Sequence, residues 1–355
     1  MKKIVLVTGI RPNLVKAFPV YRALLKKKFK PILIHTNQHS DKEMFELLWK
    51  QFNLPEPILL KYTAKNPADR LGKMIIKLSK KIEKINPDLI IVFGDGDSTL
   101  AGSLVASKLR IPLAHVEAGL RSFDRNMPEE HNRTIVDHLS DMLFITEPSA
   151  AKNLINENIS KDKTFFVGNT MIDTLILLKD KIKNDTYDKK SYILLTLHRP
   201  SNVDNKKQLK KIISFLKTIK DYPILFPIHP RTEKMLHKFN LFSKLPKNIE
   251  LLPPLSYLKC LSLERDAFVI LTDSGGIQEE STFLNVPCLT IRDGTERPVT
   301  LTEGSNSLVL SSELGIYSKV LFNKRIKKTS SIPKLWDGDA GERIAEIILQ
   351  KKFQL

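Results

Sequence analysis

Cysteine is nearly absent from this chain of 355 residues, which contains only Cys260 and Cys288. Both stand among apolar residues, so we expect small core side chains in a reducing compartment rather than a disulfide or a nucleophile. No set of His, Cys, Asp and Glu has metal-ligand spacing, so no metal is predicted. No apolar run approaches the ~20 residues that cross a bilayer, and the run at 4–7 is too short for a signal sequence. We therefore expect a cytoplasmic protein with no membrane partner.

Aromatic residues make up only 7% of the chain, although its formal net charge is +18. Such a charge invites a nucleic-acid interpretation, but there is no recurring basic-aromatic ladder, no zinc-finger spacing and no Gly-Lys-Ser/Thr phosphate loop. The lysine runs at 26–30 and 80–84 fall where helices should present solvated faces or end. We therefore expect no nucleic-acid partner. An anionic small substrate accounts better for the localised arginines.

Short apolar runs alternate with helical patterns through both halves of the sequence. The runs that we expect to be strands are 3–8, 31–36, 89–93, 113–116, 142–145, 192–196, 224–228, 249–252, 268–271 and 288–291. This alternation is typical of doubly wound parallel sheets, whose loops gather at the carboxyl ends of the strands. The expected fold class is α/β, with two Rossmann-like domains facing a cleft.

The expected domains follow from composition. The first covers residues 1–176, and a linker rich in Lys, Asp and Asn follows at 177–190. The second domain covers 191–340. The terminal helical pattern, 341–355, can pack on either domain.

The segment 271–280, Leu-Thr-Asp-Ser-Gly-Gly-Ile-Gln-Glu-Glu, follows an apolar run and opens a helix. Ser274, Gly275 and Gly276 leave the backbone N–H groups open to an anion at the positive end of that helix. Glu280 lies one helical turn beyond, where its carboxylate can accept hydrogen bonds from a ribose diol. Together these features indicate a nucleoside diphosphate. The alternative is a plain strand-to-helix turn with a solvated acid pair.

In the first half, candidate residues follow the expected strands. Arg11, in Gly-Ile-Arg-Pro-Asn after the first strand, suits a phosphate, and Lys16 lies one turn later. Carboxylates follow at three further places: Asp95, Glu117 and Glu129. Such a cluster can hold one acid protonated near neutral pH through mutual repulsion and burial.

Other residues of these motifs have alternative roles. Asp97 is expected to cap the helix that begins near residue 98, and acids at 129 and 130 can serve a helix dipole alone. Arg121 and Arg133 stand beside the acids and are candidate substrate ligands. In the second half, His198, Arg199 and His229 follow two strands. A single histidine at a strand end is more often structural, but two beside an anion cradle indicate ligand contacts.

The motifs, in this order, resemble those of the non-hydrolysing UDP-N-acetylglucosamine 2-epimerases. The elements Val-Glu-Ala-Gly-Leu-Arg at 116–121, Pro-Glu-Glu-x-Asn-Arg at 128–133 and Asp-Ser-Gly-Gly-x-Gln-Glu-Glu at 273–280 are complete, as is Thr-x-His-Arg at 196–199. The resemblance implies a glycosyltransferase-B architecture, a homodimer and no redox cofactor. It also implies an anti elimination of UDP to 2-acetamidoglucal and its re-addition after C2 is protonated on the other face.

The resemblance also implies roles for single residues. The catalytic set is Asp95, Glu117, Glu129 and His198, with the C2 base left open. The UDP-binding set is Arg11, Ser274, Gly275, Gly276 and Glu280. The residues that match or lie near an activator site are Gln38, His39, Arg70, Arg199 and His229.

Several positions depart from the family pattern. Asn13 replaces Glu, Asn37 replaces Gly, Gly96 and Asp97 replace a Thr pair, and Val299 replaces a common Glu. The predicted substrate is UDP-N-acetylglucosamine, which can also be the activator, for surface polysaccharide or glycan precursor synthesis. The alternatives are a related UDP-acetamido sugar, such as a 2,3-diacetamido uronic acid, and a glycosyltransferase of the same architecture.

Overall fold

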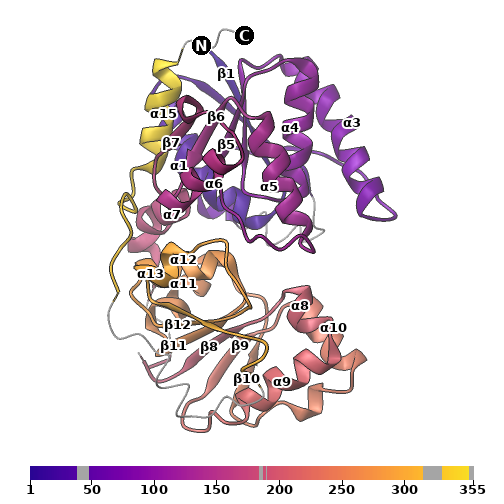
Figure 1. Cartoon of the computed structure of the whole chain (residues 1–355), viewed down its shortest axis with the longest axis vertical. Helices are drawn as coiled ribbons and strands as arrows, with labels where there is room; N and C mark the ends of the chain where they lie inside the picture. Colours follow the sequence, from indigo (N-terminus) through magenta and orange to yellow (C-terminus); the bar gives the residue numbers. More distant parts are fainter. Residues whose placement is uncertain (38–47, 184–186, 189, 315–329, 352–355) are drawn as a thin grey trace. The chain divides into compact units, whose positions relative to one another are not determined.

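The computed structural model describes residues 1–37, 48–183, 187–188, 190–314 and 330–351. The chain divides into two compact units: Met1–Leu177 with Lys334–Leu355, and Leu178–Pro333. Each unit is built on one parallel sheet with helices packed on it (Figure 1). The predicted fold class, two doubly wound parallel sheets, is confirmed.

In the described part of the first unit, the sheet has the strand order β3-β2-β1-β4-β5-β6-β7. Its strands are β1 (Lys3–Thr8), β2 (Lys30–His35), β3 (Ile58–Leu59), β4 (Leu89–Phe93), β5 (Leu113–Val116), β6 (Met142–Ile145) and β7 (Thr164–Phe166). The helices are α1 (Arg11–Lys26), α3 (Pro67–Ile85), α4 (Asp97–Leu109), α5 (Pro128–Leu139), α6 (Pro148–Asn156), α7 (Thr170–Leu178) and α15 (Ala340–Gln350), with a 3-10 turn η1 (Lys161–Lys163). Every residue of β4 and β5 is buried, as expected for strands of a parallel sheet that is covered on both faces.

The second unit repeats this plan with the strand order β10-β9-β8-β11-β12-β13 among its described residues. The strands are β8 (Ile193–Thr196), β9 (Ile224–Pro227), β10 (Ile249–Leu252), β11 (Val269–Thr272), β12 (Cys288–Ile291) and β13 (Asn306–Val309). The helices are α8 (Pro200–Val203), α9 (Lys206–Leu216), α10 (Pro230–Lys238), α11 (Tyr257–Asp266), α12 (Gly275–Phe283) and α13 (Val299–Thr302), with 3-10 turns η2 (Lys179–Lys181) and η3 (Phe242–Lys244).

The C-terminal helix α15 packs on α1 of the first unit. Gly341 permits the close approach, because a Cβ there would lie 2.8 Å from the backbone carbon of Pro19. The N–H of Gly341 donates to Asp173 Oδ2 at 2.7 Å. Ahead of the helix, Trp336 is buried and its Nε1 donates to the carbonyl of Thr146 at 3.2 Å. The second unit therefore ends at Pro333, before the expected boundary at 340.

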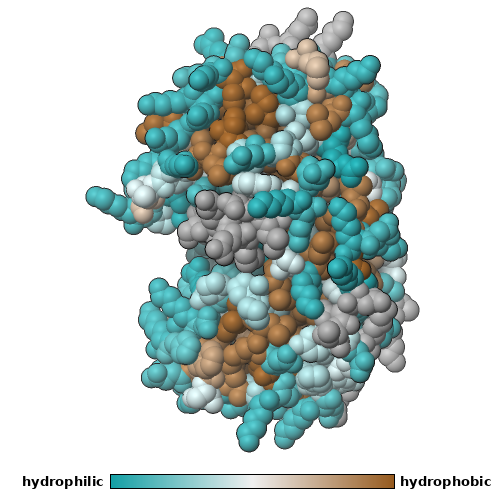
Figure 2. Space-filling view, turned by 180° about the vertical axis from the view of Figure 1, so that it is seen from behind, coloured by the Kyte–Doolittle hydropathy of each residue, from teal (hydrophilic) through white to brown (hydrophobic). Residues whose placement is uncertain are grey.

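The surface of each unit is rich in hydrophilic side chains (Figure 2). Within the residues described, no helix has the length and apolarity needed to cross a membrane. Neither cysteine forms a disulfide: Cys288 is buried and Cys260 is partly exposed. Burial raises the pKa of the Cys288 thiol to about 12, so this thiol stays protonated at neutral pH.

Candidate functional site

Loops at the carboxyl ends of neighbouring strands gather charged side chains in the first unit. β1, β4 and β5 are adjacent and parallel, so the residues that follow Thr8, Phe93 and Val116 share one edge of the sheet. There Lys16 of α1 forms an ion pair with Glu117, and both side chains are buried. Because a buried charge is costly unless it is paired, each of the two groups requires the other.

Glu117 has a left-handed backbone, with a φ of 74°. Its N–H donates to the carbonyl of Phe144 at 3.0 Å, which helps to hold it there. Gly94 faces the pair with a φ of 65°, and a Cβ on it would lie 3.2 Å from Lys16 Nζ. Strain of this kind at a residue other than glycine costs about 1–3 kcal/mol and clusters at functional sites. The conformation of Glu117 is thus a marker of function that is independent of the sequence motif.

Asp95, the residue after Gly94, is held by α5. Arg133 forms an ion pair with Asp95 and donates from Nη1 to Glu130 Oε2 at 2.8 Å. Asn132 Nδ2 donates to the backbone carbonyl of Asp95 at 2.9 Å. The Asp95 side chain remains 25% exposed, whereas that of Arg133 is 3% exposed. The buried Arg133 therefore orients the carboxylates of Asp95 and Glu130, and part of the Asp95 side chain remains accessible.

Glu129 and Glu130 are adjacent in the first turn of α5 but have different surroundings. Glu129 is exposed. Glu130 is buried and accepts hydrogen bonds from the N–H groups of Ser122 and Phe123 at 2.9 and 2.8 Å. Burial alone would raise the pKa of Glu130, but these hydrogen bonds and that from Arg133 hold its pKa below the ordinary value. Glu130 anchors a loop, and Glu129 is the acid that a ligand can reach.

Beneath these loops lies a buried network centred on Asp137. Its Oδ1 is 2.6 Å from His115 Nδ1, and its Oδ2 is 2.8 Å from Arg121 Nη2. His115 Nε2 donates to the carbonyl of Gly94 at 2.8 Å. Arg121 also binds Glu157 through two donors, at 2.6 and 2.7 Å. Burial alone would raise the pKa of Asp137, but His115 and Arg121 hold that pKa below its usual value. The structure thus places Arg121, a predicted substrate ligand, inside the scaffold.

Asn13 fixes the turn between β1 and α1. Its Oδ1 accepts from the N–H groups of Gly9 and Ile10, both at 3.2 Å, and its Nδ2 donates to the carbonyl of Phe93 at 2.7 Å. A glutamate at this position has no N–H to donate to the carbonyl of Phe93, so this contact requires the amide of asparagine. Arg11, the first residue of α1, lies partly exposed at the same turn.

Arg70 of α3 reaches the start of α4. Its Nε and Nη2 donate to Asp97 Oδ2 at 3.1 and 2.7 Å. The expectation that Asp97 caps α4 is wrong: the N-cap is Gly96, and Asp97 is the first helical residue. Its carboxylate instead neutralises Arg70. Gln38 and His39, which were grouped with Arg70 in the predicted activator site, lie outside the described residues.

In the second unit, the buried carboxylate of Asp273 organises the carboxyl edge of the sheet. It accepts from the N–H of His198 at 3.1 Å, the N–H of Arg199 at 3.0 Å and Asn202 Nδ2 at 3.1 Å. Its Oδ1 also lies 3.1 Å from His198 Nδ1. Burial alone would raise the pKa of Asp273, but the bonds from His198, Arg199 and Asn202 hold its pKa below the ordinary value. The ring of His198, 41% exposed, is thereby oriented with its Nε2 away from Asp273.

Guanidinium groups surround the first turn of α12. A Cβ on Gly275 would lie 2.6 Å from Arg297 Nη1, so any larger residue would displace this guanidinium. Arg199, Arg292 and Arg297 all pair with the buried Glu296, at 3.3, 2.7 and 2.5 Å. Arg297 also pairs with the buried Glu279 at 3.1 Å. Three cations thus share two acids at the positive end of a helix, so this end of α12 favours an anion.

The remaining predicted residues of this unit lie close to α12 or to His198. Ser274 and Gly276 are half-buried beside Gly275. Glu280 is buried and accepts from the hydroxyl of Tyr257 at 2.7 Å. His229 is exposed, with its ring centre 5.6 Å from that of His198. In the described parts of the chain, no group of three or more His, Cys, Asp or Glu side chains is arranged to hold a metal ion.

Sequence reasoning did not single out several residues that position this site. Asp273 follows an expected strand and directly precedes the Ser-Gly-Gly turn, so its position in the sequence could have marked it as a site residue. Asp137, Asn202 and Tyr257 have no local signal, because their partners are distant in sequence.

Comparison with known proteins decides the family. The family model described as UDP-N-acetylglucosamine 2-epimerase matches residues 22–349. The chain belongs to the UDP-N-acetylglucosamine 2-epimerase family. The UDP-N-acetylglucosamine 2-epimerase of Methanocaldococcus jannaschii is 44% identical over 366 residues, covering 99% of this chain and 100% of that protein. The UDP-2,3-diacetamido-2,3-dideoxy-D-glucuronate 2-epimerase of Pseudomonas aeruginosa is 35% identical, covering 98% and 99%.

Comparison with solved structures supports the same family. A crystal structure of the M. jannaschii UDP-GlcNAc 2-epimerase in complex with UDP-GlcNAc and UDP matches with a TM-score of 0.90 and 44% identity. The match covers 98% of this chain and 100% of that one. The predicted family is therefore confirmed over nearly the whole sequence.

Proposed function

We propose that this chain interconverts UDP-N-acetylglucosamine and UDP-N-acetylmannosamine by inverting C2. The observation that carries the proposal is the strained, buried Glu117 paired with Lys16, beside an Asp95 that Arg133 orients. Acid-base chemistry at a weakly acidic carbon needs positioned carboxylates, and this edge supplies them. The names of relatives that cover the full chain support the same reaction.

In this proposal, the second unit binds the UDP group. The first turn of α12 offers the backbone N–H groups of Gly275 and Gly276 to the diphosphate, with His198 nearby on the same sheet edge. Ser274 contributes its hydroxyl, because its N–H donates to Thr272 Oγ1 at 3.0 Å. Glu280 accepts hydrogen bonds from the ribose. Departure of a diphosphate develops negative charge, which these amides and cations stabilise.

The first unit supplies the acids and bases. One carboxylate of Asp95, Glu117 and Glu129 removes the C2 proton while the C1–O bond to UDP breaks, which gives 2-acetamidoglucal. A proton then returns to C2 on the opposite face, and the diphosphate oxygen re-adds at C1. Lys16 stabilises the ionised form of Glu117, and the assignment of the C2 base stays open.

The product would serve the synthesis of a surface polysaccharide or another glycan, and the enzyme would act as a homodimer. An activator site is proposed at Gln38, His39, Arg70, Arg199 and His229.

The alternative substrate is a UDP-2,3-diacetamido uronic acid, which the P. aeruginosa relative favours. The remaining alternative, a glycosyltransferase of the same architecture, requires an acceptor.

The proposal is tested by incubating the protein in heavy water with UDP-N-acetylglucosamine alone. Proton NMR should show UDP-N-acetylmannosamine with deuterium at C2 of both epimers, because the C2 proton exchanges with solvent during each cycle. A parallel incubation with the UDP-2,3-diacetamido uronic acid distinguishes the two epimerase substrates. Absence of deuterium from both sugars would contradict a C2 epimerase.

Glu280→Ala and Arg11→Ala are expected to weaken UDP binding by roughly tenfold or more. Each loses a hydrogen bond to or from a charged group, which contributes about 1.5–3 kcal/mol. Glu280→Ala also leaves the hydroxyl of Tyr257 without its buried acceptor, so Glu280→Gln is the conservative comparison. Calorimetric titration with UDP measures the affinity, and the exposed Glu303→Gln is the control. Unchanged UDP affinity in both alanine variants would remove these residues from the nucleotide site.

A further inference from the structure

Helix α9 carries a concentration of positive charge that the proposed function does not use. Residues 205–220 contain six lysines and no Asp or Glu. One face of α9 packs apolar residues such as Leu209 into the core of the second unit. Lys206, Lys210 and Lys217 are exposed on the opposite face. The charge is therefore presented to the outside of the unit.

This charge is not neutralised within the described part of the chain. There, Lys206, Lys207, Lys210, Lys217 and Lys220 form no ion pair with an acid. Lysines three or four residues apart repel one another, as do lysines in the first turn and the positive end of the helix dipole. The arrangement thus opposes helix formation. In return, the described structure shows one side-chain hydrogen bond from the six lysines of this segment, from Lys211 Nζ to the carbonyl of Ser311 at 3.2 Å.

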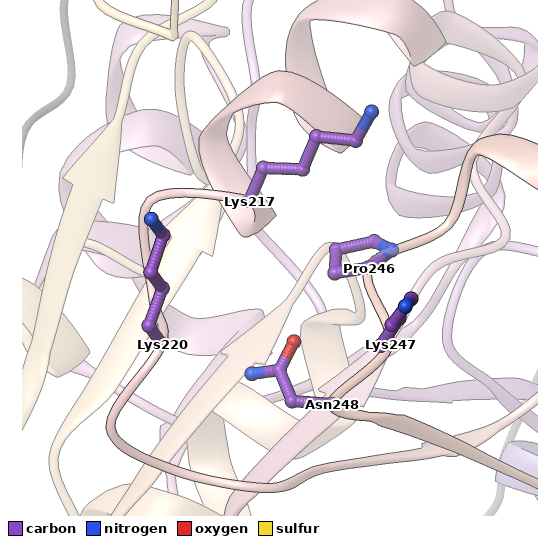
Figure 3. Close-up of a pocket in the computed structure, with 5 residues that line it drawn as sticks. All are labelled: Lys217, Lys220, Pro246, Lys247 and Asn248. Atoms are coloured by element: carbon purple, nitrogen blue, oxygen red, sulfur yellow. The ribbon is translucent and has the colours of Figure 1, made fainter.

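A cavity of about 290 Å³ lies at the end of α9. It is lined by Lys217, Lys220, Pro246, Lys247 and Asn248, and the three lysines come from two segments of the chain that meet there (Figure 3). We use the name lysine face for Lys206, Lys207, Lys210, Lys217, Lys220 and Lys247. The face combines an exposed basic helix with a cavity at its end whose lining includes three lysines.

The end of the lysine face that carries Lys217, Lys220 and Lys247 is separate from the candidate site. Lys220 precedes β9 and Lys247 precedes β10, and these two strands are parallel neighbours. Both lysines therefore lie at the amino edge of the sheet. His198 and Gly275 follow β8 and β11, so they lie at the carboxyl edge of the same sheet. A partner bound at Lys217, Lys220 and Lys247 leaves the carboxyl edge free.

The composition of the face indicates its partner. Segment 205–220 contains no arginine, and its one aromatic residue, Phe215, is buried. Binding of single-stranded nucleic acid uses aromatic stacking, and base readout uses the planar fork of arginine. Lysines act as point charges and suit a diffuse layer of phosphate headgroups. No large apolar side chain on the outer face of α9 is available for insertion, so the attraction is electrostatic.

We propose that the lysine face docks this protein on an anionic lipid bilayer, with Lys217, Lys220 and Lys247 among the groups that meet the headgroup phosphates. The expectation of no membrane partner rested on the lack of a spanning run, which a peripheral contact of this kind does not need. The test is co-sedimentation of the full chain with vesicles of phosphatidylcholine alone or mixed with phosphatidylglycerol. We expect binding to the anionic vesicles only, with release as salt screens the charges. The Lys217→Gln, Lys220→Gln, Lys247→Gln triple variant should bind about 100-fold more weakly, at about fivefold for each lysine.

The control removes the same number of charges elsewhere. Lys80→Gln, Lys81→Gln and Lys84→Gln change exposed lysines of α3 in the other unit, and this variant should keep vesicle binding. Equal loss in both triple variants would assign binding to net charge and overturn the proposal. Binding of duplex DNA without binding of anionic vesicles would also overturn it. Unchanged melting temperatures establish that both variants are folded.

Discussion

Replacing Asp95 by Asn or Glu117 by Gln is expected to lower the epimerisation rate by at least ~100-fold, the usual scale for a positioned acid or base. Both substitutions keep the side-chain volume and remove the titrating group. Asp95→Asn is the cleaner test, because its side chain is partly exposed. Glu117→Gln also leaves buried Lys16 beside a neutral amide, so its melting temperature must be measured together with its rate.

The neighbouring acids of α5 provide an internal comparison. Glu129→Gln should lose rate to a similar extent with an unchanged melting temperature, because its side chain is exposed. Glu130→Gln should lower the melting temperature, because Glu130 accepts hydrogen bonds from the loop at Ser122 and Phe123. The exposed Glu83→Gln on α3 is the control for both. A wild-type rate in Asp95→Asn, Glu117→Gln and Glu129→Gln alike would refute the catalytic assignment.

The sequence predicts the central strands well and misses three of the four edge strands of the two described sheets: β3, β7 and β13. Expected and observed bounds agree for β1, β4, β5, β6, β10 and β12. In most of these strands the apolar run is continuous, because both faces of the strand are covered. β3 and β7, at the two edges of the first sheet, were missed. These strands have only two and three residues, all half-buried, so their apolar runs are too short to be recognised as strands.

The motifs predicted the residues of the site, but not the buried residues that hold them in place. Strand-end placement brought Lys16 and Glu117 to one edge, because they follow β1 and β5, the two strands that flank β4 in the parallel sheet. Sequence could not show that Arg121 points into the scaffold, because Asp137 and Glu157 are distant from it in the chain. It also could not separate Glu129 from Glu130, since burial depends on the loop that folds over α5.

Stability of the first unit is expected to fall as pH rises from about 4 to about 7, through the ionisation of Asp173. Burial raises the pKa of this carboxyl to about 7, against the opposing effect of the N–H groups of Gly341 and Ala340. Between its unfolded and folded pKa values, the folded state binds the additional proton, so the free energy of unfolding decreases with pH. The full loss is about 4 kcal/mol and is reached above the folded pKa.

Asp173→Asn removes this titration and keeps an oxygen that can accept from the N–H of Gly341 at the start of α15. The variant should match the wild type near pH 4 and exceed its stability above pH 7. Urea unfolding followed by tryptophan fluorescence reports on the first unit, because both tryptophans of the chain, Trp49 and Trp336, belong to it. Since other groups titrate equally in both proteins, the difference between the two stabilities isolates Asp173. A difference that stays constant from pH 4 to pH 8 would show that Asp173 is already ionised throughout, and that the N–H groups of α15 outweigh its burial.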